Sequence, residues 1–186
     1  IRPLEDALDH KGPKAVMEEY EACKSYIQGL REIKDRLDEL ERTGWPVDAD
    51  VSALRKKLNR PYLYPEIEKK YQSLEAQISE WKAWREKALA AIEEWENEAS
   101  VLKPLRELVE DRSRIEEAME AFDVWEGNVN LMRGFRDKLR VMDFRGFEDY
   151  ALQIKKLTDD PRNVDKVVQM IKALDDMIDA TRKKRA

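Results

Sequence analysis

The side chains best suited to nucleophilic chemistry are scarce in this sequence, which holds one histidine, His10, and one cysteine, Cys23. A Cys–His pair would require the two to meet across the Gly12-Pro13 break, and no third group that would orient the imidazole can be identified. We expect His10 to face solvent at a helix end. Cys23 falls on a line of apolar residues, so we expect it to act as a small buried hydrophobic side chain.

Carboxylates are abundant, and paired acids can serve acid–base chemistry or bind a divalent cation. Glu93, Glu94, Glu96 and Glu98 are an example, but 40 acidic residues on helices make such pairs inevitable, so a solvated face is expected. No Glu-x-x-His pair and no phosphate-binding glycine loop is present. We therefore assign no catalytic, cofactor-binding or metal-ligating residue and no cofactor, and predict that the chain is not an enzyme. An alternative function class, a helical-bundle enzyme with a carboxylate metal site, would require that the purified protein contain stoichiometric metal.

Two basic clusters are the candidates for contact with the phosphate groups of nucleic acid or anionic lipid. The candidate phosphate contacts are Arg55, Lys56, Lys57 and Arg60 in the first cluster and Arg182, Lys183, Lys184 and Arg185 in the second. The expected fold brings acidic neighbours close to the first cluster, and the second also favours the dipole at a helix C-terminus. A solvated face or helix cap is therefore the expected role of both.

Aromatic residues are the candidates for contact with a protein partner. Most tryptophans lie at or near positions of the apolar lines and are expected in the core: Trp81, Trp95 and Trp125. Trp84 lies half a step off its line, and Tyr62 and Tyr64 lie in a segment flanked by prolines. Because exposed aromatic residues anchor protein interfaces, these three are the possible partner contacts.

Helices must position these candidates, because apolar residues recur at helical spacing in four stretches. The four apolar lines begin at Val16, Ile67, Ile115 and Val164, which are 51, 48 and 49 residues apart. Their members are Val16, Tyr20, Cys23 and Ile27; Ile67, Tyr71, Leu74 and Ile78; Ile115, Met119, Phe122 and Trp125; and Val164, Val168, Ile171 and Leu174. Self-similarity at a fixed period predicts a tandem array of one supersecondary unit.

Each unit is predicted to hold a short helix, a break and a long helix of roughly 25–30 residues, or about 40 Å. The short helices are expected near residues 4–8, after Asp50 or Ser52 with Leu54 and Leu58, from Pro104, and around Ile154 and Leu157. Aromatic residues about one period apart mark the ends of the long helices: Trp45, Trp95 and Phe144. The array is divided into four units of about 49 residues, at residues 1–46, 47–99, 100–146 and 147–186.

The short helix cannot retrace a long one, because its ~8–10 residues cover only ~12–15 Å. We expect it to fold back over the end of the preceding long helix, after which the next long helix continues in the original direction. Each overlap is then a three-helix bundle, and the whole is an elongated all-α repeat on the order of 100 Å long. The alternative is a compact antiparallel helical bundle, which short connections favour.

Composition agrees with long helices, since 40% of the 186 residues are charged and six are glycine. The net charge of −5 argues against a nucleic-acid footprint over the whole surface. No apolar run approaches the ~20 residues that span a membrane, so no membrane insertion is expected. The single cysteine allows a reducing compartment, and we expect a cytoplasmic location. Because the sequence begins at Ile1, we expect it to be a fragment of a larger protein.

The segment LERTGWPVDADVSAL, from Leu40 to Leu54, joins a long striped helix to a short one through a Gly-aromatic turn. In this it resembles the tandem long-helix/short-helix repeats of archaeal coiled-coil proteins of unassigned role. The expected zigzag is similar in topology to spectrin-like rods, whose units are about twice as long. The resemblance implies a structural or adaptor segment and brings no catalytic residues with it.

We therefore expect a non-enzymatic structural spacer, scaffold or protein-interaction segment of a larger protein. A protein partner or self-association is expected, because a leftover stripe on a long helix can pair with a second chain. The alternative is a nucleic-acid-associated helical segment that uses the two basic clusters. A steep salt dependence of DNA or RNA binding would favour that alternative.

Overall fold

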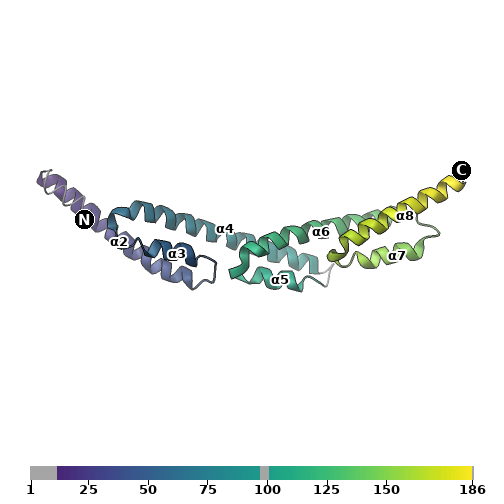
Figure 1. Cartoon of the computed structure of the whole chain (residues 1–186), viewed down its shortest axis with the longest axis horizontal. Helices are drawn as coiled ribbons and strands as arrows, with labels where there is room; N and C mark the ends of the chain where they lie inside the picture. Colours follow the sequence, from purple (N-terminus) through teal and green to yellow (C-terminus); the bar gives the residue numbers. More distant parts are fainter. Residues whose placement is uncertain (1–11, 97–100, 186) are drawn as a thin grey trace. The chain divides into compact units, whose positions relative to one another are not determined.

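The computed structural model describes residues 12–96 and 101–185, with side chains as far as Lys183. Every regular element in these ranges is helical, so the chain is all-α, as predicted. The elements in chain order (Figure 1) are α2 (Pro13–Glu41), α3 (Asp48–Arg55), η1 (Pro61–Leu63), α4 (Tyr64–Glu96), α5 (Lys103–Glu110), η2 (Arg112–Arg114), α6 (Ile115–Val141), α7 (Glu148–Leu157), η3 (Pro161–Asn163) and α8 (Val164–Arg185). The short helix expected near residues 4–8, and His10, lie outside the described residues.

A short α-helix, a three-residue 3₁₀ turn and a long helix follow one another three times in this order. The 3₁₀ turns begin at Pro61, Arg112 and Pro161, which are 51 and 49 residues apart. Proline suits the first position of such a turn because its fixed φ is already helical and its missing N–H has no partner there. The period agrees with that of the apolar lines. The number of units in the whole array stays a prediction.

The described chain forms two compact units. Unit 1 comprises the residues up to Trp84 together with Arg112–Ile115, and unit 2 comprises Arg85–Asp111 and the residues from Glu116 onwards. In unit 1 the second half of α2 packs with α3 and with the first part of α4. The ring of Trp45, which follows α2, stacks on that of Trp81 in α4 at 5.8 Å between centroids.

Ion pairs join the same three elements of unit 1. Arg55 of α3 donates to the carboxylates of Asp38 and Glu41 in α2 at 2.5 and 2.8 Å. Arg36 of α2 lies 4.0 Å from the carboxylate of Glu75 in α4. The end of one long helix, a short helix and the start of the next long helix therefore form a three-helix bundle, as the sequence predicts.

Unit 2 holds two further bundles of this kind. In the first, the end of α4 packs with α5 and with the beginning of α6. Trp95 of α4 stacks on Phe122 of α6 at 5.2 Å between ring centroids. Arg106 of α5 donates two hydrogen bonds of 2.8 Å to the carboxylate of Glu96. Of the connection between α4 and α5, Val101 and Leu102 lie in the part of the chain that is described, and 97–100 lie outside it.

The second bundle of unit 2 joins the end of α6 to α7 and the start of α8. Its core is one cluster of buried residues drawn from all three helices: Met132, Leu139, Ala151, Ile154, Val167, Ile171, Leu174 and Ile178. Lys138 of α6 donates to the carboxylate of Asp175 in α8 at 2.5 Å. Figure 1 shows α7 turning back beside α8. Helix α6 thus takes part in two successive bundles, with its two halves covered by different helices.

The three short helices begin in the same way. Helix α5 has Pro104 in its first turn, as predicted, whereas α3 begins earlier than predicted. The residue before each helix is apolar, and its carbonyl accepts the first helical hydrogen bond: Val47 from Val51, Leu102 from Arg106 and Phe147 from Ala151, at 2.9–3.0 Å. Asp50 and Ser52 are not caps, because α3 already begins at Asp48. Asp50 lies in the first turn, where its charge suits the helix dipole. The buried side chain of Val47, 1% exposed, anchors the helix start instead.

The apolar lines are confirmed in α4 and shifted by one residue in two later helices. Ile67, Tyr71, Leu74 and Ile78 are all buried in α4. In α8 the line expected at Val168 passes through Val167, which is fully buried, whereas Val168 is 45% exposed. In α6 Ala118 is fully buried in place of the expected Met119. Steps of three and four are both compatible with one helical face, so only the packing decides between them.

The long helices end near the expected aromatic residues. Helix α2 ends at Glu41, and Gly44 then takes a φ of +76°, which lets the chain turn into the buried Trp45. Gly146 takes a φ of +88° in the corresponding connection after α6. Helix α4 differs, because it continues through Trp95 to Glu96.

Arginines from elsewhere in the chain satisfy the carbonyls at three helix C-termini. The bonds run from Arg112 to the Thr43 carbonyl after α2 at 3.0 Å, from Arg85 to the Val109 carbonyl of α5 at 3.0 Å, and from Arg136 to the Thr158 carbonyl after α7 at 2.6 Å. A guanidinium here supplies donors that the helix lacks and opposes the negative end of its dipole. Arg112 also lies over the Trp45 ring, 5.8 Å from its centroid.

Replacing Arg136 by methionine is expected to lower the free energy of unfolding by ~1–3 kcal/mol, because the carbonyl beneath it is left without this donor. Thr158 is fully buried and the Arg136 side chain is 21% exposed, so water replaces the guanidinium poorly. Urea unfolding followed by circular dichroism measures the change. Arg140→Met is the control on the same helix, since the Arg140 side chain is 77% exposed. Equal effects of the two substitutions would contradict the assignment.

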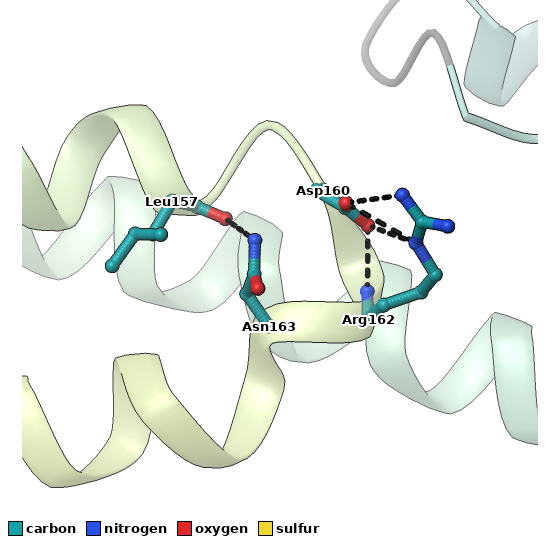
Figure 2. Close-up of polar contacts among 4 residues, drawn as sticks. All are labelled: Leu157, Asp160, Arg162 and Asn163. Atoms are coloured by element: carbon teal, nitrogen blue, oxygen red, sulfur yellow. Dashed lines mark hydrogen bonds and ion pairs between the residues drawn. The ribbon is translucent and has the colours of Figure 1, made fainter.

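Two connections of unit 2 are closed by the same Asp-x-Arg device. Figure 2 shows it in η3, where one carboxylate oxygen of Asp160 accepts from the Arg162 backbone N–H at 3.0 Å and the other from its guanidinium at 2.7 Å. The side-chain amide of Asn163 donates to the Leu157 carbonyl at 3.5 Å across the same turn. Asp143 makes the equivalent bonds to the backbone N–H and guanidinium of Arg145, at 3.3 and 2.6 Å.

The guanidinium of Arg145 and then its backbone N–H lower the pKa of Asp143 to about 2. Because the folded pKa lies below the unfolded value of about 3.9, this carboxylate stabilises the fold above pH ~4 and ceases to do so as the pH falls towards 2. We expect carbon-detected NMR titration to give a pKa near that value for Asp143, and a return towards 3.8 in Arg145→Gln. An unchanged pKa in that variant would show that the arginine is not the cause.

Candidate functional site

Half of the first basic cluster is occupied by carboxylates. Besides the bonds from Arg55 to α2, Lys57 donates to Glu66 at 2.5 Å, and this bond lowers the pKa of the Glu66 carboxyl. The side chains of Lys56 and Arg60 are exposed. A phosphate group at this cluster would have to compete with carboxylates already hydrogen-bonded to two of its four cations.

The second basic cluster lies at the end of α8. Arg182 and Lys183 are exposed, and Arg182 lies 3.9 Å from the carboxylate of Asp179. An exposed pair of this length contributes little to stability and leaves the guanidinium accessible to solvent. The side chains of Lys184 and Arg185 lie outside the described part of the chain.

The aromatic candidates for partner contact lie in different surroundings. Tyr62 of η1 is 52% exposed. Tyr64 and Trp84 are half-buried, and Trp84 has an interaction partner within the chain. Trp81 and Trp95 are buried, as expected, whereas Trp125 is half-buried. The structure therefore brings Tyr62 and Tyr64 together at the start of α4 and leaves Trp84 apart from them.

Tyr64 is held by a close contact that the sequence did not predict. Its ring stacks on that of Tyr26 in α2, with centroids 5.1 Å apart. A Cβ added at Gly29 would lie 2.4 Å from the Tyr64 ring, so the ring rests directly on the backbone of α2. The Tyr64 hydroxyl donates to Glu68 at 2.8 Å, and this bond is the main cause of its raised pKa. Gly29 is the feature of the sequence that could have indicated this contact. A glycine inside a long helix lowers helix stability, so its presence suggests a close approach by another side chain.

The first half of α2 carries an apolar face that the described residues leave uncovered. We call Val16, Tyr20, Cys23 and Ile27 the α2 face. Tyr20 is 50% and Ile27 is 42% exposed, while Val16 and Cys23 are half-buried. Cys23 was expected to be buried, and its thiol is partly accessible because no described helix lies on it.

The same line in α4 is covered. Tyr71 stands four residues after Ile67, as Tyr20 stands four residues after Val16, yet Tyr71 is only 3% exposed. Burial is the first cause that raises the pKa of Tyr71 to about 12, followed by its hydrogen bond to Glu75. In unit 1 the end of α2 and α3 provide this cover. The α2 face has the sequence of a core line without the helices that make it a core.

A groove of about 810 Å³ runs along the α2 face towards η1. Residues with apolar surface line it, including Tyr20, Cys23, Ile27, Gly29, Pro61 and Tyr64. Two acids and two bases also border it: Glu21, Glu32, Lys24 and Arg31. With charges of both signs in equal number, the groove favours an amphipathic segment over a strongly charged ligand.

A second exposed apolar surface lies on α6. We call Val124, Gly127, Leu131, Gly134 and Val141 the α6 face; their steps of three, four and seven place them on one side of the helix. The three side chains are 63%, 48% and 86% exposed in chain order. A Cβ added at either glycine would meet nothing within 4 Å.

The chemistry available to these surfaces is that of non-covalent contact. Within residues 12–96 and 101–183, no three of the His, Cys, Asp and Glu side chains are grouped closely enough to hold a metal ion. No helix in the described ranges has both the length and the apolar composition to cross a membrane.

Comparison with known proteins adds no further assignment. No protein-family model, no curated protein and no solved structure matches this chain. The resemblance to archaeal helical repeats stays an expectation from the residues between Leu40 and Leu54.

Gly29→Ala is expected to destabilise the protein relative to alanine at the open glycines of α6. The added methyl group displaces the Tyr64 ring, and forcing extra carbon into a packed site costs typically ~1–3 kcal/mol. Gly127→Ala and Gly134→Ala are the matched controls, each expected to stabilise by roughly 0.5–1 kcal/mol because they lack that contact. Thermal or urea unfolding compares the three. A stabilising Gly29→Ala would show that Tyr64 does not rest on α2.

Proposed function

We propose that this chain is a non-enzymatic spacer or scaffold segment of a larger protein. The observation that carries the proposal is that α6 belongs to two successive three-helix bundles. Its first half packs with α4 and α5 around Phe122, and its second half with α7 and α8 around Leu139. A chain that passes from bundle to bundle along one continuous helix adds length with each module and builds no enclosed site.

Two features support a mechanical role over a chemical one. The carboxylates and guanidiniums that carry strong hydrogen bonds join helices or close turns, as Arg106 does with Glu96 and Asp160 with Arg162. The exposed apolar residues lie on outward helix faces. We further propose that the α6 face meets a protein partner or a second copy of this chain, since its glycines let another helix approach closely.

A cytoplasmic setting is part of the proposal. The chain has one cysteine, so its fold requires no disulfide and suits a reducing compartment. Association with nucleic acid is less well supported, because Arg55 and Lys57 already pair with carboxylates.

Small-angle X-ray scattering tests the spacer directly. A compact protein of 186 residues has a radius of gyration of about 16 Å. If each module adds length, the monomer should give a value well above this, and a concentration series should exclude dimers as the cause. A value near that of the compact sphere would favour the alternative antiparallel bundle and remove the spacer role. Fluorescence anisotropy with a labelled DNA duplex at low salt should show no binding; tight, salt-sensitive binding would favour the nucleic-acid alternative.

A further inference from the structure

A groove between the end of α6 and α7 differs in chemistry from the same surface of the other bundles. It holds about 420 Å³ and lies within unit 2. Its apolar wall is made of Leu139 and Ala151, which are buried, Phe144, which is half-buried, and Leu152, which is 51% exposed. Three positions of the repeat explain how this groove came to be both apolar and positively charged.

The first position is a base on the short helix. The sixth residue before each 3₁₀ turn is basic, and these residues are Arg55, Arg106 and Lys155. Arg55 bonds two carboxylates of α2, and Arg106 bonds that of Glu96 in α4. Within the described ranges, no carboxylate bonds the ammonium group of Lys155. The chain therefore neutralises this base in two bundles and leaves it charged in the third.

The second position supplies an acid in unit 1 and holds another base here. Glu41 stands four residues before Trp45, and Arg140 stands four residues before Phe144, the aromatic residue that follows α6. Arg140 lines the groove, and its guanidinium donates to Asp137 at 3.0 Å. These two side chains are 77% and 71% exposed, so their ion pair contributes little and competes weakly with another carboxylate.

The third position changes from polar to apolar. Three residues before the base of each short helix stand Ser52, Lys103 and Leu152, and all three are exposed. Only the leucine gains free energy when a further apolar side chain covers it. The bundle that gains two uncompensated bases thus also gains an apolar contact beside them.

The remaining charged residues of the groove do not neutralise it. Arg136 is a third base, and its guanidinium donates to the Thr158 carbonyl at 2.6 Å. Glu148 is the one acid among the lining residues, and its carboxylate already accepts from the backbone N–H of Gly146 at 2.9 Å. Three bases and one acid around an apolar wall complement a helix that carries carboxylates beside apolar residues.

We infer that the groove between α6 and α7 binds an acidic amphipathic helix of a partner protein. The apolar residues of that helix pack on Leu152 and Phe144, and its carboxylates lie beside Arg140 and Lys155. The phosphates of a nucleic acid would use the charges and leave the apolar wall uncovered, so the observations favour the acidic helix. The inference goes beyond the proposed spacer and does not depend on it, because the radius of gyration decides the spacer role separately.

A pair of designed peptides tests the required chemistry. The probe is a fluorescein-labelled helical peptide of about 15 residues, with leucines on one face and glutamates along both flanks. Fluorescence anisotropy at low salt should show that it binds the full chain. A matched peptide with lysine in place of each glutamate should not bind, because its charges have the sign of the groove.

Three variants of the full chain locate the binding. Arg140→Glu restores the acid that unit 1 has at this position and should raise the Kd of the acidic peptide on the order of tenfold. Leu152→Ser restores the residue of α3 and should raise it at least about fivefold, because an apolar contact is lost. Lys156→Glu is the control, since it makes the same change of net charge on an exposed residue of α7 that does not line the groove. It should change the Kd by less than about twofold.

Circular dichroism verifies that each variant keeps its helix content, which is expected because all three substituted side chains are exposed. Absence of binding by the acidic peptide, equal binding of both peptides, or equal effects of Arg140→Glu and Lys156→Glu would overturn the inference. Binding of a labelled DNA duplex that Arg140→Glu weakens, without binding of the peptide, would also overturn it and would assign the groove to nucleic acid.

Discussion

The long helices carry apolar lines that no single neighbour can cover, and the rest of the structure depends on this mismatch. Helix α6 has 27 residues and extends about 40 Å, whereas the eight residues of α5 and the ten of α7 cover about 12 and 15 Å. Buried apolar side chains are worth roughly 1.5–3 kcal/mol each, so leaving half a line exposed is costly. In unit 2, α4 and α5 cover the first half of α6, and α7 and α8 cover its second half.

This constraint explains which parts of the fold were predictable. Helix class, the long apolar lines and the breaks follow from local periodicity and from glycine and proline, which act within a few residues. The phase of a line was not predictable where two apolar residues adjoin. Val167 and Val168 are equally apolar, and only the packing of α6 and α7 selects the first. Likewise Asp50 is a reasonable cap by composition, but the buried Val47 fixes the helix start.

The remaining misses depend on contacts between residues far apart in sequence. Arg112 reaches the Thr43 carbonyl across 69 positions, and no periodicity records such a bond. Gly29 lowers the stability of helix α2, and only the packing of the Tyr64 ring against it explains why a glycine stands there. The candidate site shows the same limit. The sequence predicts the residues of the α2 face as an apolar line in the core, but whether that line is buried depends on which helices pack against it.

The high charge of the chain has a structural reason that bears on its chemistry. Asp143 and Asp160 each bind an arginine two residues ahead, and Glu96 binds Arg106 of the next helix. These carboxylates close two turns and align α4 with α5. Each of these carboxylates accepts at least two hydrogen bonds from its own chain. These three carboxylates therefore serve the connections of the fold, and the exposed apolar residues lie instead on the faces of α2 and α6.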